Sequence, residues 1–546
     1  LAYDSLETLG TPRRLALLVY GLAEGQSDLV EEVKGPAKKA AFTPEGLPTK
    51  AAEGFARGQG VDVSELFVKD TGAGEYIFAT KKVAGKPTAE LLPELFSRLV
   101  TSLNFPKPMR WGELDFRFAR PIRWLVALFG QEIVDWEFVG TKAGNISFGQ
   151  RTLAPGAVTV ANPMEYRDSL KQAFVIVDHA ERRNLIWEQI KAAASSVNGT
   201  VVQDEELLEE VVHLVEYPTA LAGSFEDKYL QLPKEVVTTP MVEHQRYFPV
   251  YDQAGNLLNK FITVRNGSEA HLDTVRAGNE KVLRARLADA NFYYQEDLKT
   301  PLAEFVPRLG KIVFHEKLGT VLEKVERVRR LGGLIAEQLG VSPREAADLD
   351  RAIFLAKGDL VTLMVYDFPE LQGVMGAEYA LKSGESPEVA KAIMEHYLPR
   401  FAGDNLPETQ IGRIAAIADK LDSIVGAFAI GIQPTGSQDP YALRRQALGV
   451  TNIIIDAGYN LSLPKLFEQA YLGFAGKVEL KLGREEIQAE LAEFFQQRLR
   501  NILADQGHRY DLIDAVIAKG ADSPVEGIAR ARALAIFRET PGFAAF

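Results

Sequence analysis

Two aspartates and two histidines are the side chains of this sequence best suited to hold a divalent metal ion. Asp359 lies in the stretch AKGDLVTLMV and Asp419 in ADKLD, and His315 and His396 lie elsewhere in the chain. Carboxylate oxygen and imidazole nitrogen are common metal ligands. However, Gly358 precedes Asp359, and no histidine stands directly before an aspartate anywhere in the sequence. A ligand set without its central imidazole binds metal poorly, so we expect no metal to be bound by this chain.

The stretches around Asp359 and Asp419 are similar to those of the helical HD-type phosphohydrolases, named for their adjacent His and Asp metal ligands. That resemblance implies a histidine before the first aspartate, a further helical histidine and a distant aspartate. Gly358 stands where the first histidine belongs, Asp359 follows it, and Asp419 matches the distant aspartate. The resemblance therefore implies a degenerate domain that keeps the fold and has lost the chemistry. An active metal-dependent phosphohydrolase is kept as an alternative.

Cations and aromatic rings alternate in residues 106–124. Cations neutralise phosphates and aromatic faces stack bases, so this pattern is typical of a nucleic-acid surface. The alternative is a strand with its aromatic rings in the core and its arginines in water. The residues are Lys107, Arg110, Trp111, Phe116, Arg117, Phe118, Arg120, Arg123 and Trp124.

Residues 308–330 carry seven lysines or arginines against three glutamates. An RNA backbone could lie along such a helix, or the charges could form a solvated face with Glu–Arg pairs four residues apart. The seven cations are Arg308, Lys311, Lys317, Lys324, Arg327, Arg329 and Arg330.

A clean helix start precedes two adjacent arginines near residue 440. Asp439 is suited to the N-cap and Pro440 to the first helical position, where a missing N–H costs nothing. Arg444 and Arg445 then fall on the first turns, where anions are already favoured. We expect this end of the helix to face the phosphates of a bound nucleic acid or an acidic patch on a partner. An ion pair with a neighbouring acidic helix is the alternative.

Composition limits the classes of function. The 546 residues are 46% hydrophobic and 25% charged, which is ordinary for a folded protein of several domains. The net charge of −12 argues against general coating of nucleic acid but allows a local basic surface. There is no cysteine, which excludes disulfides and thiolate sites and agrees with a cytoplasmic location. No apolar run approaches the roughly 18 residues that span a bilayer, so we expect no membrane association.

The pattern of apolar residues predicts an α+β fold. Residues 1–150 alternate between strands, expected at 13–22, 75–83 and 116–130, and a helix at 87–103. Helices then dominate, and we expect domains at 151–300, 301–450 and 451–546. The clearest later elements are a hairpin at 247–264 and helices at 319–340, 350–366, 411–428, 484–507 and 508–520.

Nothing in the sequence points to activation of a substrate with ATP. The phosphate-binding loop G-x-x-x-x-G-K-[ST] is absent, as are G-x-G-x-x-G after a strand and H-E-x-x-H. The HIGH and KMSKS nucleotide motifs do not occur either.

A set of short stretches, spread over nearly the whole chain, resembles the β subunit of bacterial glycyl-tRNA synthetase. We expect the family's opening strand and the rest of its anticodon-binding domain to be missing. The stretches are TPRRLALLV (11–19), KGPAKKAAF (34–42), TKAAEGFARGQGV (49–61), MRWG (109–112), FARPIRWLVALFG (118–130), EHQRYFPVYD (243–252), GNEKVLRARLADANFYYQEDL (278–298), FHEKLGT (314–320), DFPELQGVMG (367–376), EHYLPRFAGD (395–404), ADKLDSIVG (418–426) and PTGSQDPYALRRQALG (434–449).

The resemblance implies a division of labour between two kinds of chain. A separate α subunit would hold the class II core, bind ATP and Mg²⁺ and make glycyl-adenylate. This chain would grip tRNA(Gly) and complete an α2β2 assembly, with no catalytic residue and no cofactor of its own. Residues 1–150 would resemble a module of phenylalanyl-tRNA synthetase β chains and 301–450 a degenerate HD-type domain. Residues 451–546 would form a linker and the start of an anticodon-binding domain like that of arginyl-tRNA synthetases.

The leading hypothesis is therefore a tRNA-binding, non-catalytic subunit of a glycine–tRNA ligase. A scaffold that never touches RNA is the third reading. Arg284 and Arg286 lie two apart and so point to different helix sides, which leaves one of them to reach RNA. On charge and expected exposure, the candidate RNA contacts are Arg284, Arg286, Lys324, Arg327, Arg330, Arg444, Arg445, Arg498, Arg500 and Arg509.

Overall fold

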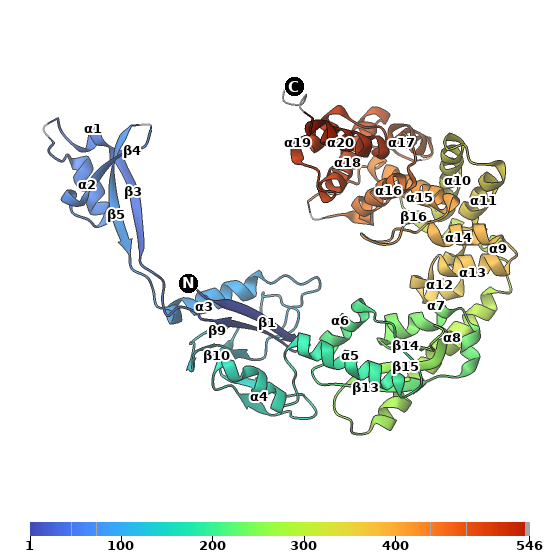
Figure 1. Cartoon of the computed structure of the whole chain (residues 1–546), viewed down its shortest axis with the longest axis horizontal. Helices are drawn as coiled ribbons and strands as arrows, with labels where there is room; N and C mark the ends of the chain where they lie inside the picture. The colour runs from blue at the N-terminus through green and yellow to red at the C-terminus, as the bar shows by residue number, and fades with distance from the viewer. Residues whose placement is uncertain (45, 73, 437, 477, 541–546) are drawn as a thin grey trace. The chain divides into compact units, whose positions relative to one another are not determined.

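The computed structural model shows small sheets followed by many helices (Figure 1), so the predicted α+β class is confirmed. It describes residues 1–44, 46–72, 74–436, 438–476 and 478–540. The chain divides into two compact units, one of residues 1–223 and 246–277 and the other of residues 224–245 and 278–546.

The first unit opens with an antiparallel hairpin. β1 (Ser5–Thr11) pairs with β2 (Arg14–Tyr20), which confirms the strand expected at 13–22. Alternation along β1 sends Leu9 into the core, because successive side chains of a strand point to opposite faces. Leu9 packs there with Val160, Tyr166, Leu170, Val175 and Val177.

A buried carboxylate holds the turn of this hairpin. The Thr11 hydroxyl donates to Glu216 Oε1 at 2.8 Å, and the Arg13 guanidinium donates to Oε2 at 3.2 Å. Arg14 Nη2 lies 3.1 Å from Glu216 Oε1. The TPRR sequence therefore has a structural task, which is to tie the hairpin to residues more than two hundred positions away.

A second small sheet has the order β3-β5-β4, and helices pack on it. Its strands are β3 (Leu29–Ala37), β4 (Phe67–Asp70) and β5 (Glu75–Val83), with α1 (Lys38–Ala41) and α2 (Lys50–Gln59) between β3 and β4. The strand expected at 75–83 is confirmed, as is the helix at 87–103, which forms α3 (Thr88–Ser102).

The single strand expected at 116–130 is wrong. Only β6 (Leu125–Val126) and β7 (Leu128–Phe129) form there, and Phe118 makes an isolated bridge with Met109. Pro121 has no N–H to donate to a ladder, which limits strand formation before it. The short strands that follow are β8 (Glu132–Ile133), β9 (Glu137–Phe138), β10 (Thr141–Gly144), β11 (Ile146–Phe148) and β12 (Ala157–Thr159).

The hairpin expected at 247–264 is confirmed. β14 (Phe248–Tyr251) pairs antiparallel with β15 (Leu257–Asn266), and β13 (Pro218–Ser224) lies on the other side of β15. The Asp252 carboxylate accepts the N–H groups of Ala254 and Asn256, which closes the turn. The helices of this region are α4 (Tyr166–Gln172), α5 (His179–Ser195) and α6 (Glu205–Leu214).

The second unit is built around one buried helix. α15 (Gln410–Ala429) is mostly apolar, and apart from Gln410, Arg413 and Asp419 all its residues are buried. A β-carbon on its Gly426 would lie 2.7 Å from Phe474, so only glycine allows that close approach. Around it pack α10 (Val321–Gln338), α11 (Pro343–Leu355), α14 (Pro387–Glu395), α16 (Leu443–Ala457) and α17 (Leu463–Leu472).

The helix expected at 350–366 is interrupted. α11 ends at Leu355, a 3-10 turn covers Gly358–Val361, and α12 (Leu363–Asp367) starts afresh. The buried carboxylate of Asp297 accepts the N–H groups of Leu363 and Met364, both at 3.0 Å. This cap supplies partners for amides that would otherwise need a continuing helix.

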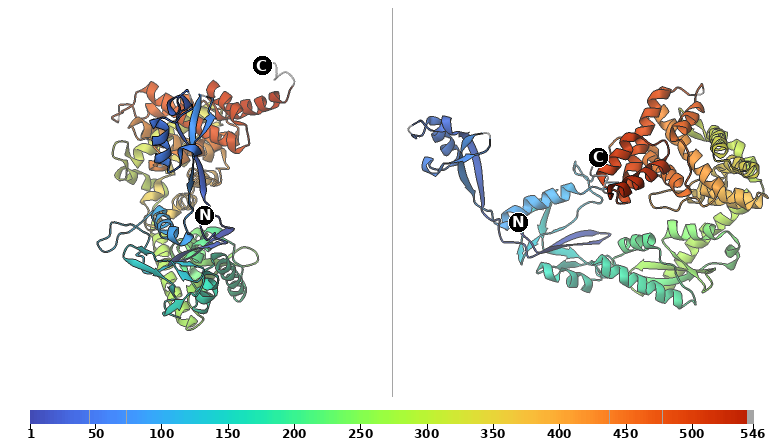
Figure 2. Two further views of the ribbon diagram at one scale, coloured as in Figure 1. Left: turned by 90° about the vertical axis from the view of Figure 1, so that its left-hand side faces the viewer. Right: turned by 45° about the horizontal axis from the view of Figure 1, so that its top comes forward.

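The expected helices at 319–340, 411–428, 484–507 and 508–520 are confirmed by α10, α15, α18 (Arg484–Asp505) and α19 (Tyr510–Lys519). α18, α19 and α20 (Pro524–Arg538) pack together in all views (red in Figures 1 and 2). Lys477 and residues 541–546 of the predicted last domain lie outside the described residues. The remaining helices are α7 (Lys234–Thr239), α8 (Leu272–Asp297), α9 (Leu302–Phe305) and α13 (Val374–Lys382). No helix formed by the described residues combines the length and the apolar character needed to cross a membrane.

Candidate functional site

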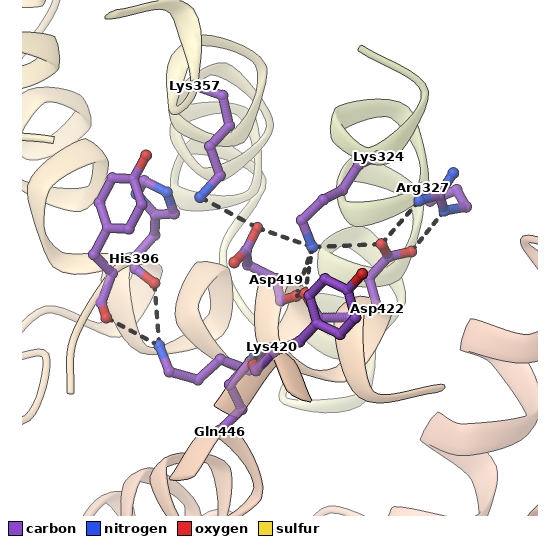
Figure 3. Close-up of polar contacts among 11 residues, drawn as sticks. Lys324, Arg327, Lys357, His396, Asp419, Lys420, Asp422 and Gln446 are labelled. Carbon is purple, nitrogen blue, oxygen red and sulfur yellow. Dashed lines mark hydrogen bonds and ion pairs between the residues drawn. The ribbon is translucent and has the colours of Figure 1, made fainter. Parts of the chain in front are cut away.

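Two buried cations of α10 face two aspartates of α15 (Figure 3). Arg327 Nε and Nη2 donate to the two oxygens of Asp422 at 2.8 and 3.1 Å. Lys324 Nζ lies 3.3 Å from Asp419 Oδ1 and 3.4 Å from Asp422 Oδ2, and it donates to the Asp419 carbonyl at 2.9 Å. We call these four residues the buried lysine–aspartate cluster. Lys324 and Arg327 are three residues apart and therefore share one helix face.

A third cation and an imidazole approach Asp419 from other elements. Lys357, just after α11, places its Nζ 3.5 Å from Asp419 Oδ1 and 3.9 Å from the centre of the Tyr397 ring. His396 directly follows α14, and its Nδ1 lies 2.5 Å from the Ile393 carbonyl oxygen. Between Lys324, Lys357, His396 and Asp419 is a hollow of about 10 Å³, enough for about one water molecule.

The ammonium groups keep Asp419 ionised. Burial alone would raise the pKa of Asp419, but the charges of Lys324, Lys357 and Lys420 hold it below its usual range. Burial lowers the pKa of Lys420 to about 7, and its Nζ donates to the Leu398 carbonyl at 2.7 Å. Burial, with Lys357 nearby, lowers the pKa of His396 well below its ordinary value, so the ring is neutral. The carboxylate therefore already has its counter-cations within the chain.

These residues do not fit a divalent metal ion. The two ammonium groups beside Asp419 would repel a metal ion. Asp359 is committed elsewhere, because its Oδ2 accepts the N–H groups of Gly373 and Gly376 at 2.6 and 2.9 Å. Burial raises the pKa of Asp359 to about 6. Outside the gaps at 45, 73, 437, 477 and 541–546, no group of three histidine, aspartate or glutamate side chains is arranged to hold a metal.

Gly358 and His315, the other candidate positions for a metal ligand, also have structural surroundings that do not favour metal binding. A β-carbon on Gly358 would lie 3.1 Å from the side chain of Leu302, so a histidine there would require that neighbour to move. His315 belongs to β16 (Val313–His315), where its Nδ1 accepts the N–H of Lys317 at 3.0 Å. Of the four metal-ligand candidates, His396 and Asp419 line the same hollow, whereas Asp359 and His315 are held elsewhere.

Sequence reasoning missed Lys357, Lys420 and Asp422 as members of this region. A signal was present, because Lys357 interrupts the apolar run AIFLAKGDLV and Lys420 stands between Asp419 and Asp422 in the otherwise mostly apolar stretch of α15. Lysine is seldom buried without a partner, so a lone lysine in such a run indicates a buried ion pair.

Three of the predicted RNA contacts lack the exposure on which their prediction depended. Lys324 and Arg327 are 4% and 7% exposed and have their partners within the cluster. Arg498 is 8% exposed, donates to the Phe494 carbonyl at 2.6 Å and lies over the Phe494 ring. All three side chains are cationic, but the helix face that carries each of them points into the protein.

The other predicted contacts are exposed, apart from the half-buried Arg444, and they are spread over α8, α10, α16, α18 and the start of α19. Arg284 of α8 pairs with Glu226, with Nε 2.9 Å from Oε1, and Arg286 is exposed on the same helix. Arg330 of α10 donates to the Gln469 carbonyl. Arg500 pairs with Asp514 and Arg509 with Asp511.

The helix start at residue 440 differs from the expected one. Pro440 lies in a 3-10 turn and α16 begins at Leu443, although the Asp439 carboxylate still accepts the N–H of Arg444 at 3.1 Å. Arg444 Nη1 donates to the Gln438 carbonyl at 3.3 Å, and Arg445 is exposed. The alternative of an ion pair between these arginines and an acidic helix is not seen among the described residues.

The stretch at 106–124 has exposed cations and packed rings. Phe118 lies 4.7 Å from Phe105, and Phe116 lies 5.0 Å from Phe138, measured between ring centres. Because these rings contact each other, they are less available to stack bases. The arrangement is closer to the alternative, with arginines in water, than to a nucleic-acid surface.

Comparison with known proteins agrees with the resemblance. A family model described as "Glycyl-tRNA synthetase beta subunit" matches residues 1–518. The glycine–tRNA ligase beta subunit of Desulfitobacterium hafniense (strain Y51) is 56% identical over 543 residues, covering 100% of this chain and 79% of the relative. Those of Desulforamulus reducens and Moorella thermoacetica are 54% and 52% identical, over 78% of each relative. This chain belongs to the glycyl-tRNA synthetase beta subunit family.

Proposed function

We propose that this chain is the β subunit of a glycine–tRNA ligase, in which it binds tRNA(Gly) for chemistry performed by a separate α subunit. The observation that carries this proposal is the match to the beta subunit family over residues 1–518. The relatives' own name, a ligase beta subunit, supports an assembly with α chains, which we infer to be α2β2.

The buried lysine–aspartate cluster supports the division of labour. Lys324 and Lys357 lie within 3.5 Å of Asp419 and supply the positive charge that a metal ion would otherwise bring. We infer that residues 301–450 keep an HD-type helical fold in which lysines have replaced metal chemistry. The ATP and Mg²⁺ that glycine activation requires would then be bound by the α subunit.

An acidic chain can still bind tRNA through local groups of cations. The net charge is −12, but binding depends on the phosphates contacted rather than on the total charge. Exposed arginines such as Arg286, Arg330 and Arg445 are available for such contacts. The location we propose is the cytoplasm, where tRNA is charged.

An omission experiment tests this function. The chain, a glycyl-tRNA synthetase α subunit, tRNA(Gly), glycine and ATP are mixed, and glycyl-tRNA is measured with each component left out in turn. We expect charging to need both chains, and we expect the chain to co-purify with α. Charging by α alone at an undiminished rate, or by this chain alone, would contradict the proposal.

The two rival functions predict different results in the same preparation. A phosphohydrolase would release phosphate from nucleotides or RNA ends when Mn²⁺ is added to the isolated chain, and Asp419→Asn would abolish that release. A pure scaffold would co-purify with α while the complex bound tRNA no more tightly than α alone. We expect neither result.

A further inference from the structure

Tyr441 is an exposed ring held on a strained backbone. The residue is 54% exposed, and its hydroxyl makes no hydrogen bond within the part of the chain that the structure describes. Tyr441 and Ala442 have φ of 62° and 53°, in the left-handed region that costs free energy for residues other than glycine. Two side chains hold this turn: Gln446 donates to the Tyr441 carbonyl at 2.9 Å, and Asp439 accepts the N–H of Arg444. Ser437, in the same loop, lies outside the described residues.

A second segment, distant in sequence, meets this ring. His315 of β16 lies 5.8 Å from Tyr441 between ring centres, with an angle of 71° between the rings. The His315 ring accepts the N–H of Lys317, which places the exposed Lys317 beside it. The hairpin of β16 and β17 (Gly319–Thr320) and the turn before α16 therefore present two rings together.

Two exposed cations close to these rings in sequence have no acidic partner. Lys317 and Arg445 are exposed, and neither forms an ion pair with a carboxylate among residues 438–476 or elsewhere in the described chain. Arg284, Arg500 and Arg509, by contrast, each pair with a carboxylate of this chain. The acidic residues closest to these cations in sequence are Asp439 and Glu316. The Asp439 carboxylate accepts the N–H of Arg444, and Glu316 is exposed.

We propose that Tyr441, His315, Lys317 and Arg445 form a contact site for an unpaired nucleotide of an RNA. We call these four residues the Tyr441 patch. A base stacks on the free face of Tyr441, and the phosphates on either side of that nucleotide meet Lys317 and Arg445. An exposed ring with unpaired cations on the same two segments suits single-stranded RNA, because every base has a face that stacks and every nucleotide carries a phosphate. This inference rests on the proposed tRNA-binding function and names a place where binding occurs.

The backbone geometry permits a clean test of the ring. Tyr441→Gly removes the ring and also suits the positive φ, so it should not disturb the turn. Tyr441→Phe keeps the stacking face. Two variants serve as controls for Tyr441→Gly. Ala442→Gly relieves the backbone strain at the neighbouring residue and keeps the Tyr441 ring. Tyr366→Ala removes the ring of a residue that is 85% exposed on another helix.

The measurement is fluorescence anisotropy of labelled tRNA(Gly) titrated with the complex of this chain and the α subunit. We expect Tyr441→Gly to weaken binding by about 5- to 150-fold, the range for losing one stacked base, while Tyr441→Phe and both controls bind like the unaltered complex. Arg445→Gln should reduce the dependence of log K on log salt by about one unit.

Several outcomes would overturn the site. Binding unchanged in Tyr441→Gly would remove this inference alone, provided that the unaltered complex binds tRNA. Loss in Tyr441→Phe equal to that in Tyr441→Gly would assign the effect to the hydroxyl and contradict stacking. Loss of α co-purification with unchanged tRNA affinity would make the patch a protein interface. No tRNA binding by the unaltered complex would remove both this inference and the proposed function.

Discussion

The buried lysine–aspartate cluster and the Tyr441 patch lie in the same unit and contain similar basic side chains. The cluster stabilises the fold, whereas the patch is proposed to bind a partner. In the cluster, Lys324 and Arg327 are at most 7% exposed and each contacts Asp422. In the patch, Lys317 and Arg445 are exposed and have no carboxylate partner in the described chain. The comparison shows that exposure and pairing, rather than the number of cations, decide whether a basic stretch serves the fold or a partner.

Helix α10 carries both buried cations that stabilise the fold and cations at the surface. On α10, Lys324 and Arg327 point toward α15, while Arg329 pairs with Asp350 and Arg330 is exposed. At 3.6 residues per turn, positions three apart share a face, whereas Arg329 is turned by more than half a turn from Arg327. A count of charges along the helix cannot separate these roles.

The largest expected effect follows from removing the shared anion of the cluster. Asp422→Ala leaves the guanidinium of Arg327 buried without its carboxylate, and it leaves the ammonium of Lys324 with Asp419 as its remaining carboxylate. Breaking a buried pair in this way costs about 3–5 kcal/mol of the free energy of unfolding. The measurement is urea unfolding at pH 7, with hydrogen exchange of α10 and α15 to localise the loss.

Asp350→Ala is the matched control, because it removes the partner of another α10 arginine at the surface. The Asp350 side chain is 53% exposed, so its loss should change the free energy of unfolding by at most about 1 kcal/mol. Equal effects of the two variants would show that burial does not distinguish the cluster from the surface.

The next effect is a pH dependence carried by Asp359. Burial raises its pKa to about 6, above the unfolded value, so the folded state holds a proton between about pH 4 and 6 that the unfolded state has lost. Stability from this group is therefore greatest at low pH and falls as pH rises through 6, by up to about 3 kcal/mol.

Asp359→Asn removes this titration and keeps an oxygen to accept the N–H groups of Gly373 and Gly376. Unfolding free energies of the variant and the unaltered chain are compared at pH 4 and at pH 7. We expect their difference to shift in favour of the variant as the pH rises. A difference independent of pH would mean that Asp359 titrates normally in the folded state.

Local pattern predicted much of the fold. The strand at 75–83 and the helix at 87–103 were readable because their periodicity and end signals agree with their structure. The break in 350–366 was not readable, because Asp297, more than sixty positions away, supplies the cap of α12. Elements fail to be predicted where a distant side chain decides their ends.

The same limit applied to the site. Asp419 was found from its local motif, whereas Lys324 was assigned to RNA because its partners lie ninety-five and more positions away in sequence. Tyr441 carried no local signal, since its importance comes from a strained turn and from a histidine in another segment. The role of each of these residues depends on contacts with residues distant in sequence, and a single sequence does not show those contacts.

A smaller effect should distinguish exposed from buried cations in tRNA binding. Arg330→Gln and Arg284→Gln each remove an exposed charge, so each should reduce the slope of log K against log salt by about one unit if it meets a phosphate. Lys324→Met should leave that slope unchanged in the folded protein, because its ammonium is buried against Asp419 and Asp422. A lowered slope in Lys324→Met would mean that the cluster opens when RNA binds.

The smallest effect is the coupling between Arg329 and Asp350. Two of the guanidinium nitrogens donate to the two carboxylate oxygens, at 2.9 and 2.7 Å, but water reaches both side chains and screens the attraction. A double-mutant cycle with Arg329→Gln and Asp350→Asn should therefore give a coupling of about 0.2–1 kcal/mol that weakens with salt. The equivalent cycle with Arg327→Gln and Asp422→Asn should give a larger coupling that salt does not change, since both of these side chains are almost fully buried. If both coupling energies weaken with salt to the same extent, solvent reaches the buried pair. Burial would then not distinguish the cluster from the surface pair.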